Sequence, residues 1–173
     1  MLLDRAGIAY RLVAPGPEPE GEGEAIERAR QRARSKALGA HPPAGDGLVL
    51  GADTVVEWRG RELGKPAGAE AARAMLRALS GETHRVHSAV CLALPGGRIL
   101  EDVASASVRV AVLDDAQIDA YVATGSWRGK AGGYGIQEAE CGFAHLVAGG
   151  MDTVVGLPVD LVRALLRRAE GVT

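Results

Sequence analysis

The stretch "GLVLGADTVVEW", residues 47–58, decides the fold of this chain. Apolar runs lie on both sides of a single acid, Asp53. A short and nearly continuous apolar segment is typical of a buried strand. An aspartate is unusual there, because burying a carboxylate costs free energy. Asp53, followed at once by the hydroxyl of Thr54, therefore marks a candidate functional site.

The composition limits the class of protein. With 173 residues, 47 % hydrophobic and 24 % charged, the chain suits one globular domain over residues 1–173 with a real core. A net charge of −2 argues against a nucleic-acid or membrane-surface binder but allows a small anionic ligand. Cys91 and Cys141 are too far apart for a zinc motif, and no apolar stretch approaches the roughly 18 residues of a membrane helix. We expect a soluble, cytoplasmic protein.

Helical and strand patterns alternate along the chain, which predicts an α/β domain. Glycines and prolines in "GPEPEGEG", residues 16–23, indicate a loop that carries Glu18 and Glu20. The glycine-rich stretch "TGSWRGKAGGYGIQ", residues 124–137, is longer than most loops, and long ordered loops are usually functional. The expected strands are 9–15, 47–58, 84–94, 99–113 and 143–147, and the expected helices are 24–38, 69–79, one capped by Asp114 and Gln117, and one opened by Pro158.

The basic residues of the 24–38 helix and the histidines at 84 and 87 are expected to have structural and not functional roles. Basic residues recur at every second position of the 24–38 helix, which distributes them around it and favours a solvated face over a nucleic-acid contact. His84 and His87 are expected on a strand surface and not as a metal pair.

Two lysines could bind phosphate. Lys65 lies on a turn in "GKP", and Lys130 lies among glycines whose backbone N–H groups can approach a ligand. Nearby acids could hold a divalent cation through oxygen ligands. The glycine-rich loop matches neither a Walker loop nor a dinucleotide fingerprint.

Five segments occur in a characteristic order and spacing: "LGADTVV" (50–56), "GKP" (64–66), "MLRALSGETHRV" (75–86), "KAGGYGIQ" (130–137) and "VVGLP" (154–158). Together they resemble the Maf family of nucleoside triphosphate pyrophosphatases. The resemblance implies an α/β fold with an elongated, mixed and twisted sheet, helices packed on it and a central cleft, similar to the inosine-triphosphate pyrophosphatases. A homodimer is common in the family, so the resemblance makes a homodimer possible here without deciding whether it forms.

The resemblance also implies a reaction. Water attacks the α-phosphorus of a nucleotide and gives the monophosphate and pyrophosphate, with Asp53 as proton acceptor. A divalent cation, Mg²⁺ or Mn²⁺, would bind Asp53 and a second acid, either Glu18 or Glu20. Lys65 and Lys130 would neutralise charge on the phosphates.

The motifs "ADT" and "YGIQ" resemble the dTTP/UTP pyrophosphatase branch of the family and not the branch that acts on 7-methyl-GTP. Thr54 and Gln137 are the specificity positions by that match. A glutamine amide suits the O4 and N3–H edge of uracil or thymine, but it can rotate to fit cytosine. Modified pyrimidine nucleotides are further candidates.

The chain departs from the family at several positions. It begins just after the place of the family's first strand and its S-x-S-P-R-R phosphate loop, so we expect weaker catalysis. Ser126-Trp127 and Gly129-Lys130 stand where the family usually has Glu-Pro and Asp-Lys, and Ser88 replaces a threonine. Two hypotheses remain: a pyrimidine-nucleotide pyrophosphatase, or a nucleotide-binding relative that acts on cell division through a partner.

Overall fold

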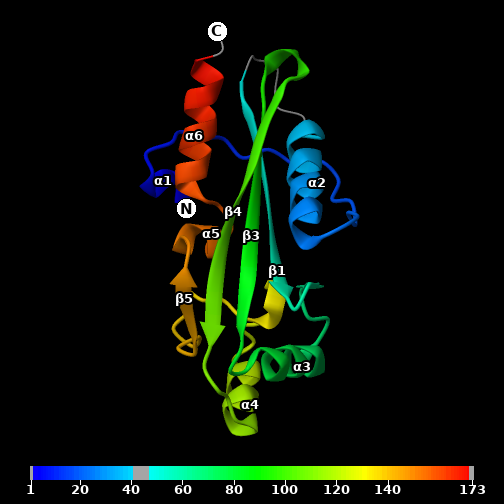
Figure 1. Cartoon of the computed structure of the whole chain (residues 1–173), viewed down its shortest axis with the longest axis vertical. Coiled ribbons are helices and arrows are strands. Elements are labelled where there is room, and N and C mark those ends of the chain that lie inside the picture. The colour runs from blue at the N-terminus through cyan, green and yellow to red at the C-terminus, as the bar shows by residue number, and fades with distance from the viewer. Residues whose placement is uncertain (1, 41–46, 172–173) are drawn as a thin grey trace.

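A five-stranded sheet of order β2-β1-β3-β4-β5 forms the centre of the computed structural model, which describes residues 2–40 and 47–171 (Figure 1). The α/β class with helices on a sheet is confirmed. Every strand pair in the described part of the chain is antiparallel, so the expectation of a mixed sheet was wrong there. The strands are β1 Val49–Trp58, β2 Arg61–Leu63, β3 Thr83–Ala93, β4 Ile99–Val110 and β5 Ala144–Ala148.

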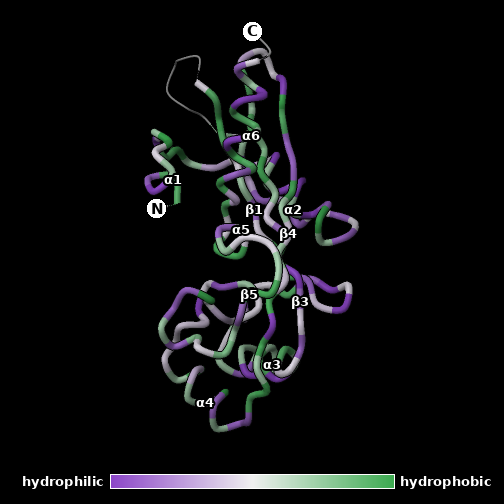
Figure 2. Tube along the Cα trace, turned by 60° about the vertical axis from the view of Figure 1, so that its left-hand side comes forward, coloured by the Kyte–Doolittle hydropathy of each residue, from purple (hydrophilic) through white to green (hydrophobic). Residues whose placement is uncertain are grey.

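The helices cover both faces and one end of this sheet. Helix α2 lies along β1 and β3, α5 and α6 lie on the other side, and α3 and α4 cluster at one end (Figure 1). The molecule is elongated, and the strands join the part around α3 and α4 to the part around α2 and α6 (Figure 2). The helices are α1 Leu2–Arg5, α2 Ala25–Leu38, α3 Ala69–Leu79, α4 Asp115–Thr124, α5 Met151–Val155 and α6 Val159–Glu170, with 3₁₀ turns η1 Pro95–Gly97 and η2 Ala131–Gly133.

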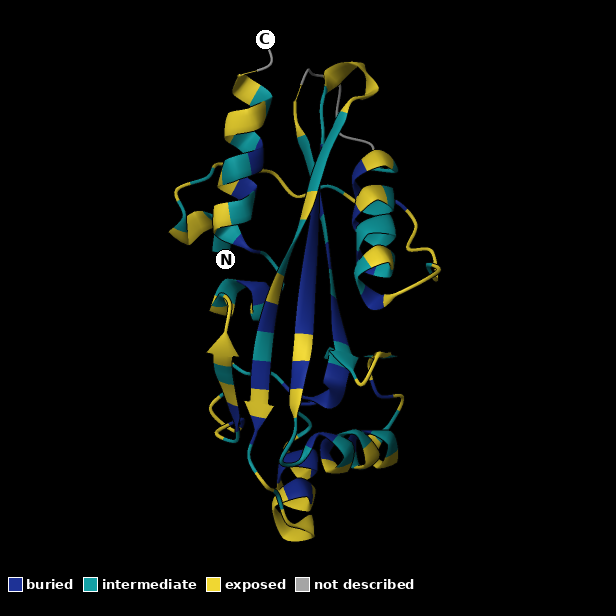
Figure 3. Ribbon diagram, viewed as in Figure 1, coloured by how far each residue is buried: buried dark blue, intermediate teal, exposed yellow. Residues whose placement is uncertain are grey.

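Most of the central strand β3 is buried (Figure 3). Because successive strand residues point to opposite faces of a sheet, the buried side chains of β3 contribute to the core on both faces. Ala89 and Cys91 face α2, whereas Val90 and Leu92 pack with α6. Val86, on the α6 face but nearer the other end, packs with α3 and α4. The core therefore consists of one cluster on the α2 face of the sheet and two clusters on the opposite face.

Helix α2 packs closely against β1. Its buried residues are all alanines spaced four apart, Ala25, Ala29, Ala33 and Ala37. A Cβ atom on Gly51 would overlap the carbonyl oxygen of Ala33 and lie 2.6 Å from the Ala37 nitrogen. The small residues on both elements therefore let the helix backbone approach the strand, and this brings the neighbouring charged side chains of α2 onto β1.

Most predicted elements are confirmed, including the capping box of Asp114 and Gln117, but two expectations were wrong. Residues 9–15 form no strand, and Leu12 is 72 % exposed. The chain that follows pairs with α2 instead: the Gly16 N–H donates to the Lys36 carbonyl (3.2 Å), and the Ser35 hydroxyl donates to the Pro17 carbonyl (2.7 Å). The expected turn before the last helix contains the short helix α5.

No helix in the described ranges is both long and apolar enough to cross a membrane.

Candidate active site

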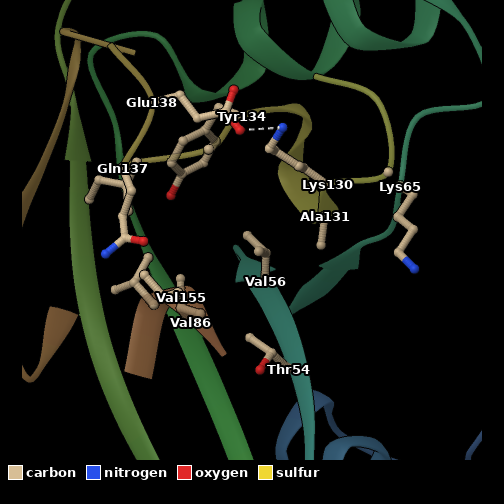
Figure 4. Close-up of a pocket in the computed structure, with 14 residues that line it drawn as sticks. Thr54, Val56, Lys65, Val86, Lys130, Ala131, Tyr134, Gln137, Glu138 and Val155 are labelled. Atoms are coloured by element: carbon tan, nitrogen blue, oxygen red, sulfur yellow. Dashed lines mark ion pairs between the residues drawn. The ribbon is translucent and has the colours of Figure 1, made fainter. Parts of the chain in front are cut away.

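A cavity of about 410 Å³ opens on the face of the sheet that carries α5 (Figure 4). Four of the predicted site residues line it: Thr54 from β1, Lys65 from the loop after β2, and Lys130 and Gln137 from the glycine-rich loop. Its volume is in the range of small-ligand sites in proteins. The remaining lining comes from Val56, Val86, Gly129, Ala131, Tyr134, Gly135, Ile136, Glu138, Val154 and Val155.

The walls of this cavity are largely apolar, with a few polar groups. Val56, Val86 and Val155 lie between the hydroxyl of Thr54 and the amide of Gln137 (Figure 4). A flat ring with a polar edge matches such a lining, because the ring faces contact the valines while the edge meets the hydroxyl and the amide.

The two lysines come from loops that are tied together. The Gly132 N–H donates to the Gly64 carbonyl (3.1 Å), which joins η2 to the segment of Lys65. The Lys130 ammonium donates to the Ser126 carbonyl (2.6 Å) and to Glu138 Oε1 (2.7 Å). An ammonium has three donors, so one remains. Lys65 is exposed and makes no ion pair within 4 Å among the described residues, so its charge is the less compensated of the two.

Asp53 does not line this cavity. Successive strand residues point to opposite faces, so Asp53 faces α2 while Thr54 faces the cavity. The carboxylate is 8 % exposed, and its Oδ1 accepts a hydrogen bond from Lys36 Nζ at 2.5 Å. The Arg32 guanidinium lies 3.9 Å from Oδ2. The structure thus places the predicted proton acceptor and the predicted specificity residues on two sides of one strand.

The basic residues of α2 are not simply a solvated face, and that interpretation was wrong for three of them. Arg28, Arg32 and Lys36 are spaced four apart, so they form one stripe that faces acids near β1. Glu62 on β2 pairs with Arg28 (3.3 Å) and with Arg32 (2.6 Å). The sequence did not reveal the role of Lys36, because basic residues at every second position hide the subset that is spaced four apart and lies on one face of the helix.

Glu18, and not Glu20, lies near the buried carboxylate. Glu18 Oε2 is 2.9 Å from Lys36 Nζ, the same ammonium that binds Asp53. Glu20 contributes its backbone carbonyl, which accepts from Arg32 Nη2 at 2.6 Å. The proline-rich segment is held along α2 by such backbone contacts, and this positions the Glu18 carboxylate.

The electrostatics of the cluster follow from burial and pairing. Burial raises the pKa of Asp53, and the hydrogen bond and charge of Lys36 oppose that rise. The hydrogen bond to Lys36 lowers the pKa of Glu18, and the charge of Lys65 adds to this effect. Lys65 therefore lines the cavity and also acts on the acid cluster, which links the two sides of β1.

The acid cluster has the donor chemistry of a hard divalent cation site. Asp53 Oδ2 is buried and has no hydrogen-bond partner, and Glu18 lies nearby, because both acids pair with the Lys36 ammonium. Carboxylate oxygens are the ligands that Mg²⁺ and Mn²⁺ prefer. Across residues 2–40 and 47–171, no group of three or more His, Cys, Asp or Glu side chains could hold a metal ion. A cation would therefore take its other ligands from water and phosphate.

Both histidines are buried, so the expectation of surface positions was wrong. His84 Nε2 is 2.6 Å from the hydroxyl of Tyr134, and burial lowers the pKa of His84 to about 4. His87 lies between Ser105 Oγ (2.7 Å) and Glu57 Oε2 (3.1 Å). Strand alternation alone could not reveal this, because helices or loops cover both faces of β3.

Trp127 anchors the glycine-rich loop in the core. The side chain is buried, and its indole N–H donates to the Val122 carbonyl (2.9 Å). The adjacent Ser126 carbonyl accepts from Lys130. Ser126 and Trp127 therefore support the loop that carries Lys130 and Gln137.

Residues 1–169 match the family described as Maf-like protein. The chain belongs to the Maf family. It is 42 % identical over 135 residues to the dTTP/UTP pyrophosphatase of Pyrococcus horikoshii, covering 78 % of this chain and 72 % of that protein. It is 46 % identical over 121 residues to the dTTP/UTP pyrophosphatase of Agrobacterium fabrum, covering 70 % and 58 % respectively.

A third Maf relative, the dTTP/UTP pyrophosphatase of Anaeromyxobacter dehalogenans strain 2CP-1, is 50 % identical over 125 residues. That alignment covers 70 % of this chain and 64 % of the relative. The matched part of this chain thus spans between 58 % and 72 % of the length of these three relatives.

Proposed function

We propose that this Maf protein is a nucleoside triphosphate pyrophosphatase that hydrolyses dTTP and UTP to the monophosphate and pyrophosphate. The names of its relatives support this activity. One observation in the chain itself carries the proposal: a cavity of about 410 Å³ with Thr54 and Gln137 lies across a single strand from the buried carboxylate of Asp53.

A nucleotide would reach both sides by passing the edge of β1. Strand β2 pairs with β1 only over residues 56–58. On that edge, within the described residues, the stretch 49–55 has no strand partner. With the base in the cavity, the triphosphate would pass this edge beside Lys65 and reach Asp53 and Glu18. Lys65 is the group that acts on both regions, and its charge would stabilise the phosphates.

Asp53 would accept the proton of the water that attacks the α-phosphorus. Burial raises the pKa of this carboxyl, which makes it a better base than an exposed aspartate. The hydrogen bond and the charge of the Lys36 ammonium favour its ionised form and fix its orientation. Asp53 and Glu18 would hold a divalent cation, which would neutralise charge on the phosphates. Lys130 would offer its remaining N–H to the leaving pyrophosphate.

The direct test is product analysis with purified protein. We expect dTTP and UTP, with Mg²⁺ or Mn²⁺, to give one pyrophosphate per monophosphate, and no orthophosphate until an inorganic pyrophosphatase is added. Excess chelator should abolish turnover. Orthophosphate as the first product, or full activity in chelator, would contradict the proposal. Tight nucleotide binding without turnover would instead indicate the non-catalytic alternative.

A further inference from the structure

A chain of two hydrogen bonds runs from the cavity into the core. Ser88 on β3 is fully buried, and its Oγ donates to the Thr153 carbonyl of α5 at 2.7 Å. The same Oγ lies 2.7 Å from Thr54 Oγ1, which lines the cavity. The buried serine therefore connects a cavity residue to the backbone of the short helix.

Proton counting fixes the direction of the second bond. A serine hydroxyl has one proton, and a peptide carbonyl can only accept. Because Ser88 gives its proton to Thr153, it can only accept from Thr54. The proton of Thr54 therefore points away from the cavity, and its Oγ1 offers only lone pairs to a ligand.

The surrounding backbone holds this arrangement in place. Helix α5 has only five residues, so most of its carbonyls have no partner within the helix, and Ser88 satisfies that of Thr153. Gly156, which ends α5, has φ 119°, and a Cβ atom there would lie 3.3 Å from Thr54 Oγ1. The end of α5 thus packs directly against the threonine hydroxyl.

We propose that Ser88 is a specificity-determining positioning residue, because it makes Thr54 an obligate acceptor in the cavity. This inference rests on the proposed function and goes beyond it. Uracil and thymine present a donor at N3, whereas cytosine presents an acceptor there. A lone pair on Thr54 attracts the first and repels the second. Gln137 can rotate its amide to suit either base, so the fixed hydroxyl is the group that rejects cytosine.

The test compares kcat/KM for dTTP and dCTP in the wild type and in Ser88→Ala. In that variant the Thr54 hydroxyl loses its acceptor and can turn its proton into the cavity. We expect the preference for dTTP to fall by roughly ten- to a hundredfold, the size expected when a buried polar mismatch is relieved. Calorimetric affinities for dTMP and dCMP should change in the same direction.

Three further variants separate positioning from packing. Ser88→Thr keeps a hydroxyl and should keep the preference. Ser105→Ala removes a serine hydroxyl on the opposite face of the sheet and should also keep it. Thr54→Val should reduce the preference, and adding Ser88→Ala to Thr54→Val should change it no further, because Ser88 acts through Thr54.

The outcomes are distinct. A wild type that binds dTMP over dCMP but hydrolyses neither triphosphate would refute the proposed function and leave this inference standing if Ser88→Ala removes the binding preference. An unchanged preference in a folded Ser88→Ala would overturn the inference. Equal use or equal binding of the two bases by the wild type would overturn it as well.

Discussion

Asp53 and Thr54 are consecutive residues of β1, yet their side chains bind partners on opposite faces of the sheet. The Asp53 carboxylate meets Lys36 of α2 at 2.5 Å, and the Thr54 hydroxyl meets Ser88 of β3 at 2.7 Å. The period of two along a strand makes this inevitable. The site is therefore divided by a single strand, and a substrate that touches both residues must pass its edge.

Replacing Lys36 by methionine should destabilise the fold. The change leaves the buried Asp53 carboxylate with only the more distant Arg32, 3.9 Å away. A buried acceptor that loses its charged partner costs about 1–3 kcal/mol, so the free energy of unfolding in urea should fall by that amount. Lys36→Met combined with Asp53→Asn should cost less than the sum of the single changes. Strict additivity would mean that the two side chains are not coupled.

Gly51→Ala should push α2 away from β1. The added methyl would overlap the Ala33 carbonyl and crowd the Ala37 nitrogen, and overpacking of this kind costs about 1–3 kcal/mol. Because α2 carries Lys36, turnover should fall as well. Gly47→Ala is the matched control, since a Cβ atom there meets nothing within 4 Å. If both variants keep wild-type stability and turnover, the close approach of helix and strand is unimportant.

His84 should make the fold sensitive to acid. Burial lowers its pKa to about 4 from 6.5, so between these values the unfolded chain binds a proton that the folded chain does not. The free energy of unfolding therefore has its full value above pH 6.5. It falls by about 3 kcal/mol as the pH is lowered to about 4. His84→Gln cannot titrate, so its free energy of unfolding should fall less between pH 7 and pH 4.5. If the free energy of unfolding of the wild type and of His84→Gln depends on pH in the same way, His84 is not the cause of the acid sensitivity.

Local patterns predicted the elements well because each depends on nearby residues. The apolar run of β1 and the capping box at Asp114 need no distant partner to be recognised. The predicted strand at 9–15 was wrong for the opposite reason. A strand needs a neighbouring strand to pair with, which alternation alone does not supply, and the residues that follow bind α2 instead. Antiparallel pairing throughout the described sheet also depends on long-range order.

The candidate site could be predicted only in part. The motifs identified Thr54, Lys65, Lys130 and Gln137, and the structure gathers all four around one cavity. The partner of Asp53 was missed, because Lys36 reaches it only through the close packing of α2 on Gly51. That approach depends on small residues in two distant segments, which no single motif records.

Turnover of dTTP by Asp53→Asn tests the central claim most directly. The amide keeps the shape of the side chain but cannot accept the proton of water, so kcat should fall by about 10²–10⁴. The affinity for dTTP should stay within a few fold of the wild type. Asp102→Asn, which changes an exposed carboxylate on β4, should leave both quantities unaltered. A folded Asp53→Asn protein that turns over dTTP at the wild-type rate would contradict the account, because the buried carboxylate would then be structural.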